Sequence, residues 1–360
     1  MTTAAVVVIF VSGLLAWSLT PASKVGEGEP VFVSLTSSDR EAAAEELVRH
    51  GLLGSPGLFR LYLKALLPTV ELEAGDHLLR RGLSPRELAA RLARLPARGK
   101  SSLLVPEGFH RKKIALRLEK AEVCGAQAFL AATESLALLG ELGLEEPSAE
   151  GYLFPATYEL AHDTRPEDVV RRMVNEAKRR LQAAKAKHPE AHARLTQKGL
   201  SDRDWVTLAS IVERETGNAP ERALIASVFL NRLSDPSLEP KGRLQSDPTA
   251  AYGCEFEPER ARTCAEFTGR VTPALLRDAD NRYNTYRHAG LPPGAIGSPG
   301  MAALEAVLSP AQTDYLYFVA DGSGRHAFSR TFEEHQLAVD RLRALRGPSP
   351  SAPLTPAAVE

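Results

Sequence analysis

Two glutamates close to the end of one amphipathic segment have the chemistry of a general acid. The segment SDRDWVTLASIVERETG (201–217) begins with a polar cap region and ends in glycine, which predicts a helix. Trp205, Leu208 and Val212 recur along it at steps of three and four, a spacing that places them on one apolar stripe. Glu215 falls on the same stripe, so we expect its side chain to point toward the buried residues.

Two effects are expected to keep Glu215 protonated near neutral pH. Burial disfavours the charged carboxylate and raises its pKa, and the negative pole of the helix C-terminus, within one turn at Gly217, acts in the same direction. A protonated carboxyl is what acid-catalysed cleavage of a glycosidic bond requires. Glu213 lies about 200° away around the helix and is the alternative acid. Considered alone, this helix is also compatible with a surface glutamate that pairs with Arg214 or Arg222.

Hydrogen-bonding and aromatic side chains are frequent in three later segments that we expect to be loops, 242–253, 281–300 and 315–335. Tyrosine mixed with Asn, Gln and Asp suits a saccharide, which offers hydroxyls at its rim and C–H groups on its faces. The alternative is a set of ordinary turn residues, since LPPG and SPG are turn signals by themselves. The candidate substrate-binding residues are Gln245, Asp247, Tyr252, Asn284, Thr285 and Tyr286.

Seven stretches resemble, in order and spacing, the endolytic murein transglycosylase family (MltG/YceG-like). The resemblance covers nearly the whole chain, from about residue 30 to about residue 345. The stretches are VPEG (105–108), EGYLFPATY (150–158), LASIVERET (208–216), RLQSDPT (243–249), YNTY (283–286), GLPPGAIGSPG (290–300) and YLYFVADGSGRHAFS (315–329).

This resemblance implies an active-site glutamate in the ERET segment, and Glu215-Thr216 looks like the Glu-Ser helix end of other lytic transglycosylases. It implies cleavage between N-acetylmuramic acid and N-acetylglucosamine with a 1,6-anhydro end, cutting of nascent glycan strands, and peptidoglycan synthases as further partners. The alternatives are a muramidase hydrolase, with Asp247 or Glu213 as second carboxylate, and a non-catalytic peptidoglycan-binding scaffold. No metal or cofactor is implied.

The chain departs from the family pattern in two places. Ala156 stands where the family usually has Asp, so no role is carried to that position. The segment between Gly253 and Asn281 is longer than expected and contains Cys254 and Cys264. These two cysteines form a disulfide if the compartment is oxidising, or remain free thiols. Neither they nor the third cysteine, at position 124, shows the spacing of a metal site.

The N-terminus predicts a membrane anchor. Residues 1–23 carry no charge, and Ala4 to Leu19 is a nearly continuous apolar run. We expect an uncleaved single-pass anchor in the inner (plasma) membrane, with the catalytic domain outside the cytoplasm, in the periplasm. A cleaved signal peptide and a buried core helix are the alternatives. Lys and Arg (44) nearly cancel Asp and Glu (45), which argues against a nucleic-acid partner.

The element pattern predicts an α+β fold. PVFVSL (30–35) alternates like a strand, VELEAGDHLLRRG (70–82) reads as two strands with a turn at Gly75, and Ser84 with Glu87 forms a capping box. The expected parts are a transmembrane anchor (1–23), a LysM-like α/β module (24–100), a connecting region with a second strand–helix unit (101–200), a mixed α+β catalytic domain (201–346) and a disordered proline-rich tail (347–360).

Overall fold

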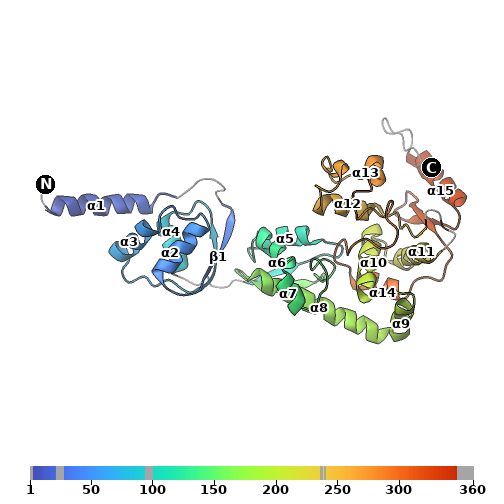
Figure 1. Cartoon of the computed structure of the whole chain (residues 1–360), viewed down its shortest axis with the longest axis horizontal. Helices are drawn as coiled ribbons and strands as arrows, with labels where there is room; N and C mark the ends of the chain where they lie inside the picture. Colours follow the sequence, from blue (N-terminus) through green and yellow to red (C-terminus); the bar gives the residue numbers. More distant parts are fainter. Residues whose placement is uncertain (1–2, 22–27, 94–99, 236–237, 239–240, 347–360) are drawn as a thin grey trace. The chain divides into compact units, whose positions relative to one another are not determined.

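The fold is a helix-rich α+β arrangement, which confirms the predicted class. The structure is a computed structural model, and it describes residues 3–21, 28–93, 100–235, 238 and 241–346 (Figure 1). The predicted tail (347–360) lies outside these residues. The chain divides into two compact units, which are described separately. The first contains Met1–Val105, Arg111–Ser148 and Thr157–Arg172, and the second contains Pro106–His110, Ala149–Ala156 and Met173–Glu360.

The first part of unit 1 is a two-stranded sheet with helices packed around one core. The sheet is antiparallel and pairs Pro30 with Arg80 at one end and Leu35 with Gly75 at the other. Ser84 and Glu87 form the predicted capping box. The elements are α1 (Thr3–Ser18), β1 (Pro30–Leu35), α2 (Arg40–Arg49), α3 (Pro56–Leu66), β2 (Gly75–Arg80) and α4 (Pro85–Leu92).

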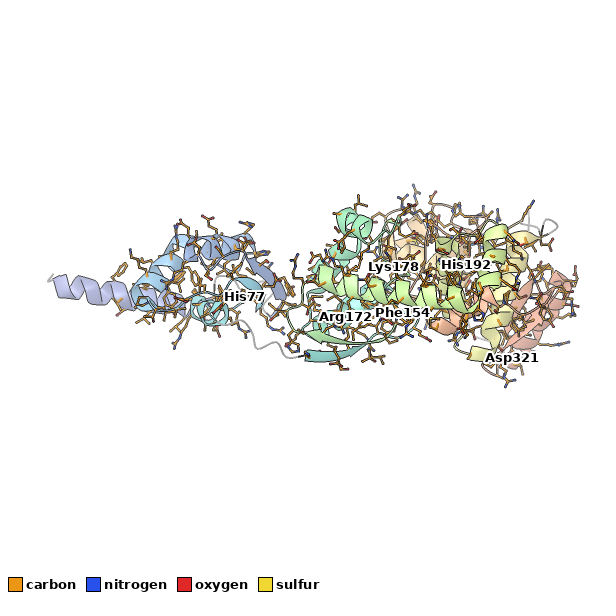
Figure 2. The ribbon with its side chains drawn as sticks, turned by 90° about the horizontal axis from the view of Figure 1, so that it is seen from below. His77, Phe154, Arg172, Lys178, His192 and Asp321 are labelled. Carbon is orange, nitrogen blue, oxygen red and sulfur yellow. A yellow bond between two sulfur atoms is a disulfide. The ribbon has the colours of Figure 1, made fainter. Side chains whose placement is uncertain are left out.

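The prediction of a strand on each side of Gly75 was wrong for the first of them. Residues 70–74 are irregular because their backbone groups bond to side chains and to Leu92 at the end of α4 instead of to a strand. The Val70 carbonyl accepts from the Arg40 guanidinium, and the Glu73 carbonyl accepts from buried His77 at 2.8 Å. His77 is labelled in Figure 2.

The helix α1 carries the segment predicted as an anchor. Its 16 residues are followed by Leu19 and Thr20. Leu14 is buried in the core of the same unit, and Trp17 lies edge-on to Tyr62 of α3, with ring centroids 6.4 Å apart. Across the part of the chain that the structure describes, no helix combines the length and apolarity needed to span a bilayer. The membrane anchor and the cellular location stay predictions.

The remainder of unit 1 is a second antiparallel pair of strands with three short helices. Lys100 pairs with Ala161 and Leu104 pairs with Thr157. The long charged helix α8 (Pro166–Lys187) has residues in both units, and it carries Arg172 and Lys178 (Figure 2). The other elements are β3 (Lys100–Leu104), α5 (Arg111–Lys120), α6 (Ala126–Thr133), α7 (Leu136–Glu141) and β4 (Thr157–Ala161).

Unit 2 surrounds one buried helix, α10. The helices α11, α12 and α14 contact it (Figure 1). After α8, the elements of unit 2 are α9 (Pro189–Gln197), α10 (Asp202–Glu215), η1 (Ala219–Glu221), α11 (Arg222–Ser234), α12 (Asp247–Phe256), η2 (Arg262–Cys264), α13 (Pro273–Arg277), α14 (Met301–Leu308), β5 (Tyr317–Ala320), β6 (His326–Ser329) and α15 (Phe332–Arg346).

Two of the three predicted loop segments contain regular structure. In 242–253, α12 begins at Asp247, and Pro248 occupies its first turn, where a missing N–H costs no helical hydrogen bond. In 315–335, β5 and β6 form a hairpin whose turn is held by Asp321, which accepts from the Ser323 N–H at 2.8 Å. Turn residues dominated the sequence pattern of both segments and concealed the short elements beside them. The segment 281–300 is irregular, as predicted.

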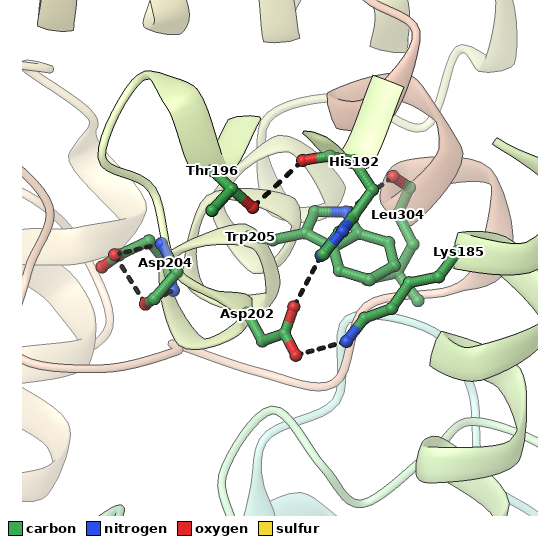
Figure 3. A network of polar contacts seen from close by, with 8 residues as sticks. Lys185, His192, Thr196, Asp202, Asp204, Trp205 and Leu304 are labelled. Atoms are coloured by element: carbon green, nitrogen blue, oxygen red, sulfur yellow. Dashed lines mark hydrogen bonds and ion pairs between the residues drawn. The ribbon is translucent and has the colours of Figure 1, made fainter. Parts of the chain in front are cut away.

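The helix α10 is fixed at its start by polar contacts and along its length by burial. Asp202 accepts from Lys185 of α8 and from His192 of α9, the latter at 2.8 Å (Figure 3). The indole N–H of Trp205 donates to the Leu304 carbonyl of α14 at 2.9 Å. Eight consecutive residues, from Trp205 to Val212, are buried. This anchoring gives the far end of α10 a defined position.

Two glycines permit close approaches that a side chain would block. Gly151 of the EGYLFPATY motif has a φ of +86°, and a Cβ there would lie 2.5 Å from the Cβ of Ala295. A Cβ on Gly253 would lie 1.9 Å from Oδ1 of Asn281, whose amide donates to the Ala250 carbonyl at 2.8 Å. The upstream motif EGYLFP thus packs inside unit 2, against the same loops that form the candidate site.

Candidate active site

Glu215 is the last residue of α10, and its carboxyl is largely withdrawn from solvent. The helix ends there because Thr216 takes an extended conformation, with φ −145° and ψ 136°. Burial raises the pKa of Glu215 to about 7, and the negative charge of Asp247 acts in the same direction. The hydrogen bond from Ser246 and the positive charge of Arg214 oppose this shift. Glu215 therefore holds a proton up to near-neutral pH.

A cavity of about 380 Å³ opens at Glu215. Its wall is formed by the end of α10, by α11, by the segment before α12, by β5 and by α15. Of the sequence-predicted residues, Glu215, Gln245, Asp247 and Tyr286 line it. The other lining residues are Val228, Arg232, Leu244, Leu316, Tyr317, Phe318, Val319, Ala320, His326 and His335.

Ser246 is the direct hydrogen-bond partner of Glu215. Its hydroxyl donates to Oε1 of Glu215. Its own N–H donates to Oγ1 of Thr285 at 3.0 Å, and its carbonyl accepts from Oγ1 of Thr249 at 2.6 Å. The two threonine hydroxyls are 2.9 Å apart. The RLQSDPT and YNTY segments thus meet at Ser246 and fix the hydroxyl that contacts the acid.

Asp247 is a second carboxylate on the cavity wall. The hydroxyl of Tyr286 donates to Oδ1 of Asp247 at 2.7 Å. Burial raises the pKa of Tyr286, and the charge of Asp247 raises it further. The phenol therefore stays protonated and continues to donate to the carboxylate. This contact fixes Asp247 beside Glu215 in a single cavity.

Three of the predicted substrate-binding residues lie outside the cavity lining and brace the loops instead. Tyr252 is buried and donates to Oε2 of Glu150 at 3.0 Å. Asn284 is fully buried, and its amide donates to carbonyls at the end of α13, including that of Asp278 at 2.8 Å. Thr285 is buried among Ser246 and its neighbours. Residues that suit sugar hydroxyls suit backbone carbonyls equally well.

Glu213, the alternative acid, is held in an ion pair outside the cavity lining. Its side chain is 5% exposed, and its two oxygens accept from Nη2 of Arg222 and from the N–H of Gly300, both at 3.0 Å. The helical count correctly placed Glu213 away from Glu215. The face it occupies is also buried, since α14 begins directly after Gly300. Glu213 thus connects α10 to the starts of α11 and α14.

The loop that departs from the family pattern is closed by a covalent bond. The structure joins Cys254 of α12 to Cys264 of η2 by a disulfide, with Cα atoms 4.7 Å apart. Both sulfurs lie in a small apolar cluster with Leu275 of α13. Cys124, in unit 1, is free and buried. Within the described ranges, no group of His, Cys, Asp and Glu side chains has the arrangement to hold a metal ion.

A family model described as the YceG-like family matches residues 36–341. The chain belongs to the YceG-like family. The family prediction made from the sequence motifs is therefore confirmed. The match contains all of the cavity-lining residues as well as most of unit 1.

Two named relatives and one solved structure are similar over most of the chain. The endolytic murein transglycosylase of Bacillus subtilis (strain 168) is 28% identical over 323 residues, which cover 85% of this chain and 82% of that protein. The endolytic murein transglycosylase of Streptococcus pneumoniae (strain D39 / NCTC 7466) is 28% identical over 319 residues. These cover 81% of this chain and 54% of the pneumococcal protein. A crystal structure of a YceG-like protein from Listeria monocytogenes, 28% identical, aligns with a TM-score of 0.54 and covers 86% of this chain and 99% of that one.

Several residues that line the cavity, or that contact its acid, were not predicted as site residues. Ser246 lies inside the RLQSDPT motif and could have been found from it. Arg232 follows an apolar run in α11, where a single charge is usually a solvated or paired end residue. Tyr317, His326 and His335 come from segments read as loop. Tyr317 and His326 belong to the β5–β6 hairpin and His335 to α15, so their place on the wall depends on how these elements pack.

The two glutamates are expected to respond oppositely to amide substitution. Glu215→Gln removes the acid, so cleavage falls by about 10²-fold or more while the fold persists. Glu213→Gln leaves Arg222 without its nearest carboxylate and lowers the free energy of unfolding by about 3 kcal/mol, with residual cleavage. Thermal unfolding and product formation, measured on both variants, test this. A stable, inactive Glu213→Gln beside an active Glu215→Gln would reverse the assignment.

The hydroxyl of Ser246 is expected to set the upper pH limit of activity. It donates to the carboxylate form of Glu215 and so lowers that pKa. Ser246→Ala removes this stabilisation, the pKa rises above about 7, and the alkaline limb of kcat/KM moves to higher pH. The matched control is Ser227→Ala, which removes a buried hydroxyl bonded to Thr313 at 2.7 Å and should leave the limb in place. A shift to lower pH in Ser246→Ala would contradict the assignment.

Proposed function

We propose that this YceG-like protein is an endolytic lytic transglycosylase of peptidoglycan. It cuts between N-acetylmuramic acid and N-acetylglucosamine, leaves a 1,6-anhydro end, and acts on nascent glycan strands. The observation that carries the proposal is the carboxyl of Glu215, which lies at the wall of a cavity and has its pKa raised to about 7 by burial. The names of the Bacillus and Streptococcus relatives support the substrate class.

In the first step Glu215 acts as general acid. Its protonated carboxyl donates to the glycosidic oxygen as the bond to the anomeric carbon of N-acetylmuramic acid breaks. The transition state carries positive charge at that carbon. Asp247, fixed by Tyr286, is a negative group on the same wall and stabilises that charge.

In the second step the same residue acts as general base. The Glu215 carboxylate takes the proton from the 6-hydroxyl of the N-acetylmuramic acid residue, and the resulting oxygen bonds to the anomeric carbon. The acid is thereby regenerated, and no water is consumed. One carboxyl performs both transfers, which explains why a pKa near the working pH is favourable. The Ser246 hydrogen bond stabilises the carboxylate between the two steps.

A muramidase-type hydrolase is the second candidate, and the observation that favours it is Asp247 in the cavity of Glu215. In a hydrolase this second carboxylate would activate a water or bond to the sugar. Glu213 is less suited to that role, since both of its oxygens are engaged by Arg222 and Gly300. The two candidate reactions differ in their products, because hydrolysis gives a reducing end.

The rest of the chain is proposed to bring this site to the cell wall. Residues 1–23 would anchor the protein in the plasma membrane with unit 2 in the periplasm, where synthases supply nascent strands. The uncharged N-terminal sequence supports the anchor. The order β1–α2–α3–β2, with the strands antiparallel, supports a LysM-like module in unit 1.

Product analysis with purified peptidoglycan tests the reaction. The full-length protein is expected to release fragments with anhydro ends, detected by mass spectrometry, and Glu215→Gln is expected to release none. Glu266→Gln, the same change at an exposed residue of unit 2, is the matched control and should cleave normally. Reducing ends would identify a hydrolase. No cleavage by the wild-type protein would favour a non-catalytic scaffold.

A further inference from the structure

The cavity that contains the acid also contains a buried positive charge. Arg232 of α11 is 4% exposed and lines the cavity. Its Nε donates to the Arg243 carbonyl and its Nη1 to the Leu316 carbonyl, both at 2.8 Å, while Nη2 donates to Oε1 of Gln245. All three acceptors are neutral. These contacts orient the guanidinium without neutralising it.

This charge has no carboxylate partner among the residues that the structure describes. A buried ion is costly unless it is paired, and a guanidinium stays protonated even where burial lowers its pKa. A guanidinium has five N–H groups, and only three of those on Arg232 have protein acceptors in the described part of the chain. Because Arg232 lines the cavity, its remaining N–H groups are on a side chain that a ligand in the cavity can contact. Such a group is arranged to receive an anion.

A second polar side chain on the same wall has a ring nitrogen without a hydrogen-bond partner among the described residues. His335 of α15 lines the cavity, and its Nδ1 is buried without a hydrogen bond to any described residue. Its ring stacks on Tyr317, with centroids 5.2 Å apart and planes 24° from parallel. The guanidinium of Arg232 lies 5.3 Å from the centroid of the same tyrosine ring. Tyr317 therefore holds both groups on one patch of the wall.

We propose that Arg232 and His335 form a subsite that binds a carboxylate of the glycan substrate. The proposal rests on the proposed function and names the feature that the site reads. N-acetylmuramic acid differs from N-acetylglucosamine by a lactyl ether, which ends in a carboxylate on strands without peptide and carries the peptide stem on others. The stem has carboxylates of its own. Either source offers the planar, two-oxygen acceptor that matches an arginine fork.

The subsite would explain how one cavity distinguishes the two alternating sugars. A neutral N-acetylglucosamine polymer leaves Arg232 uncompensated, so binding it includes the cost of desolvating the charge. A muramic acid residue with its carboxylate at Arg232 offsets that cost and places its anomeric carbon in the cavity of Glu215. The register of the cut is then determined by charge as well as by shape.

Binding measured without cleavage tests the subsite. The full-length Glu215→Gln protein is titrated calorimetrically with the N-acetylglucosaminyl-N-acetylmuramic acid disaccharide and with the same disaccharide converted to its neutral methyl amide. A lactyl source predicts at least about 10-fold weaker binding of the amide. A third and a fourth probe are the disaccharide-peptide and its version with amidated stem carboxylates. If the peptide stem supplies the carboxylate, the amidated version should bind more weakly by at least the same factor.

The protein side of the test removes the cation. Adding Arg232→Gln to Glu215→Gln should abolish the preference for the charged probe, while adding Arg341→Gln, at an exposed position of α15, should preserve it. If the protein with Arg232→Gln does not fold, the comparison of charged and neutral probes in Glu215→Gln alone tests whether the cavity binds a carboxylate. Equal affinities within both probe pairs, or no binding of any probe, would overturn the proposal. Because no cleavage is measured, the result is independent of whether the products are anhydro or reducing ends.

Discussion

The candidate site in unit 2 depends on one constraint, which is that the carboxyl of Glu215 is removed from water. A buried carboxylate is costly unless hydrogen bonds compensate it, and the hydroxyl of Ser246 donates directly to Glu215. That partial compensation places its pKa at about 7. A fully compensated carboxylate would be ionised and unable to donate a proton. An isolated one would hold its proton too tightly to act as a base in the second step.

Three other charged residues of unit 2, Glu213, Asp247 and Arg232, have roles that differ from the proton transfer assigned to Glu215. Glu213 is paired with Arg222 and binds the start of α14, which holds the end of α10 in place. Asp247 is fixed by Tyr286 and raises the pKa of Glu215 through its charge. Arg232 remains positive on the wall of the same cavity and lacks an acidic partner among the described residues. The acid Glu215, the negative charge of Asp247 and the proposed anion subsite at Arg232 thus lie in one cavity and have different roles.

The sequence predicted those features that depend on local periodicity. The orientation of Glu215, whose carboxyl is withdrawn from solvent, follows from the 3.6-residue period of α10, and the capping box at Ser84 follows from residue types three positions apart. It did not predict which loop polar groups face the cavity, because Tyr252 and Asn284 satisfy buried backbone and carboxylate groups instead. Arg232 was missed because its significance depends on which long-range partners are absent, and sequence spacing does not report that.

Direct titration of Glu215 tests its assignment as the general acid. The side-chain carboxyl carbons of ¹³C-glutamate-labelled protein are followed by NMR across pH, and the Glu215 signal is assigned by its loss in Glu215→Gln. Burial in the structure predicts a midpoint at about 7. A midpoint near the ordinary value of 4.5 would mean that the carboxyl is ionised at neutral pH. In that case Glu215 could not serve as the general acid, and its assignment to that role would be wrong.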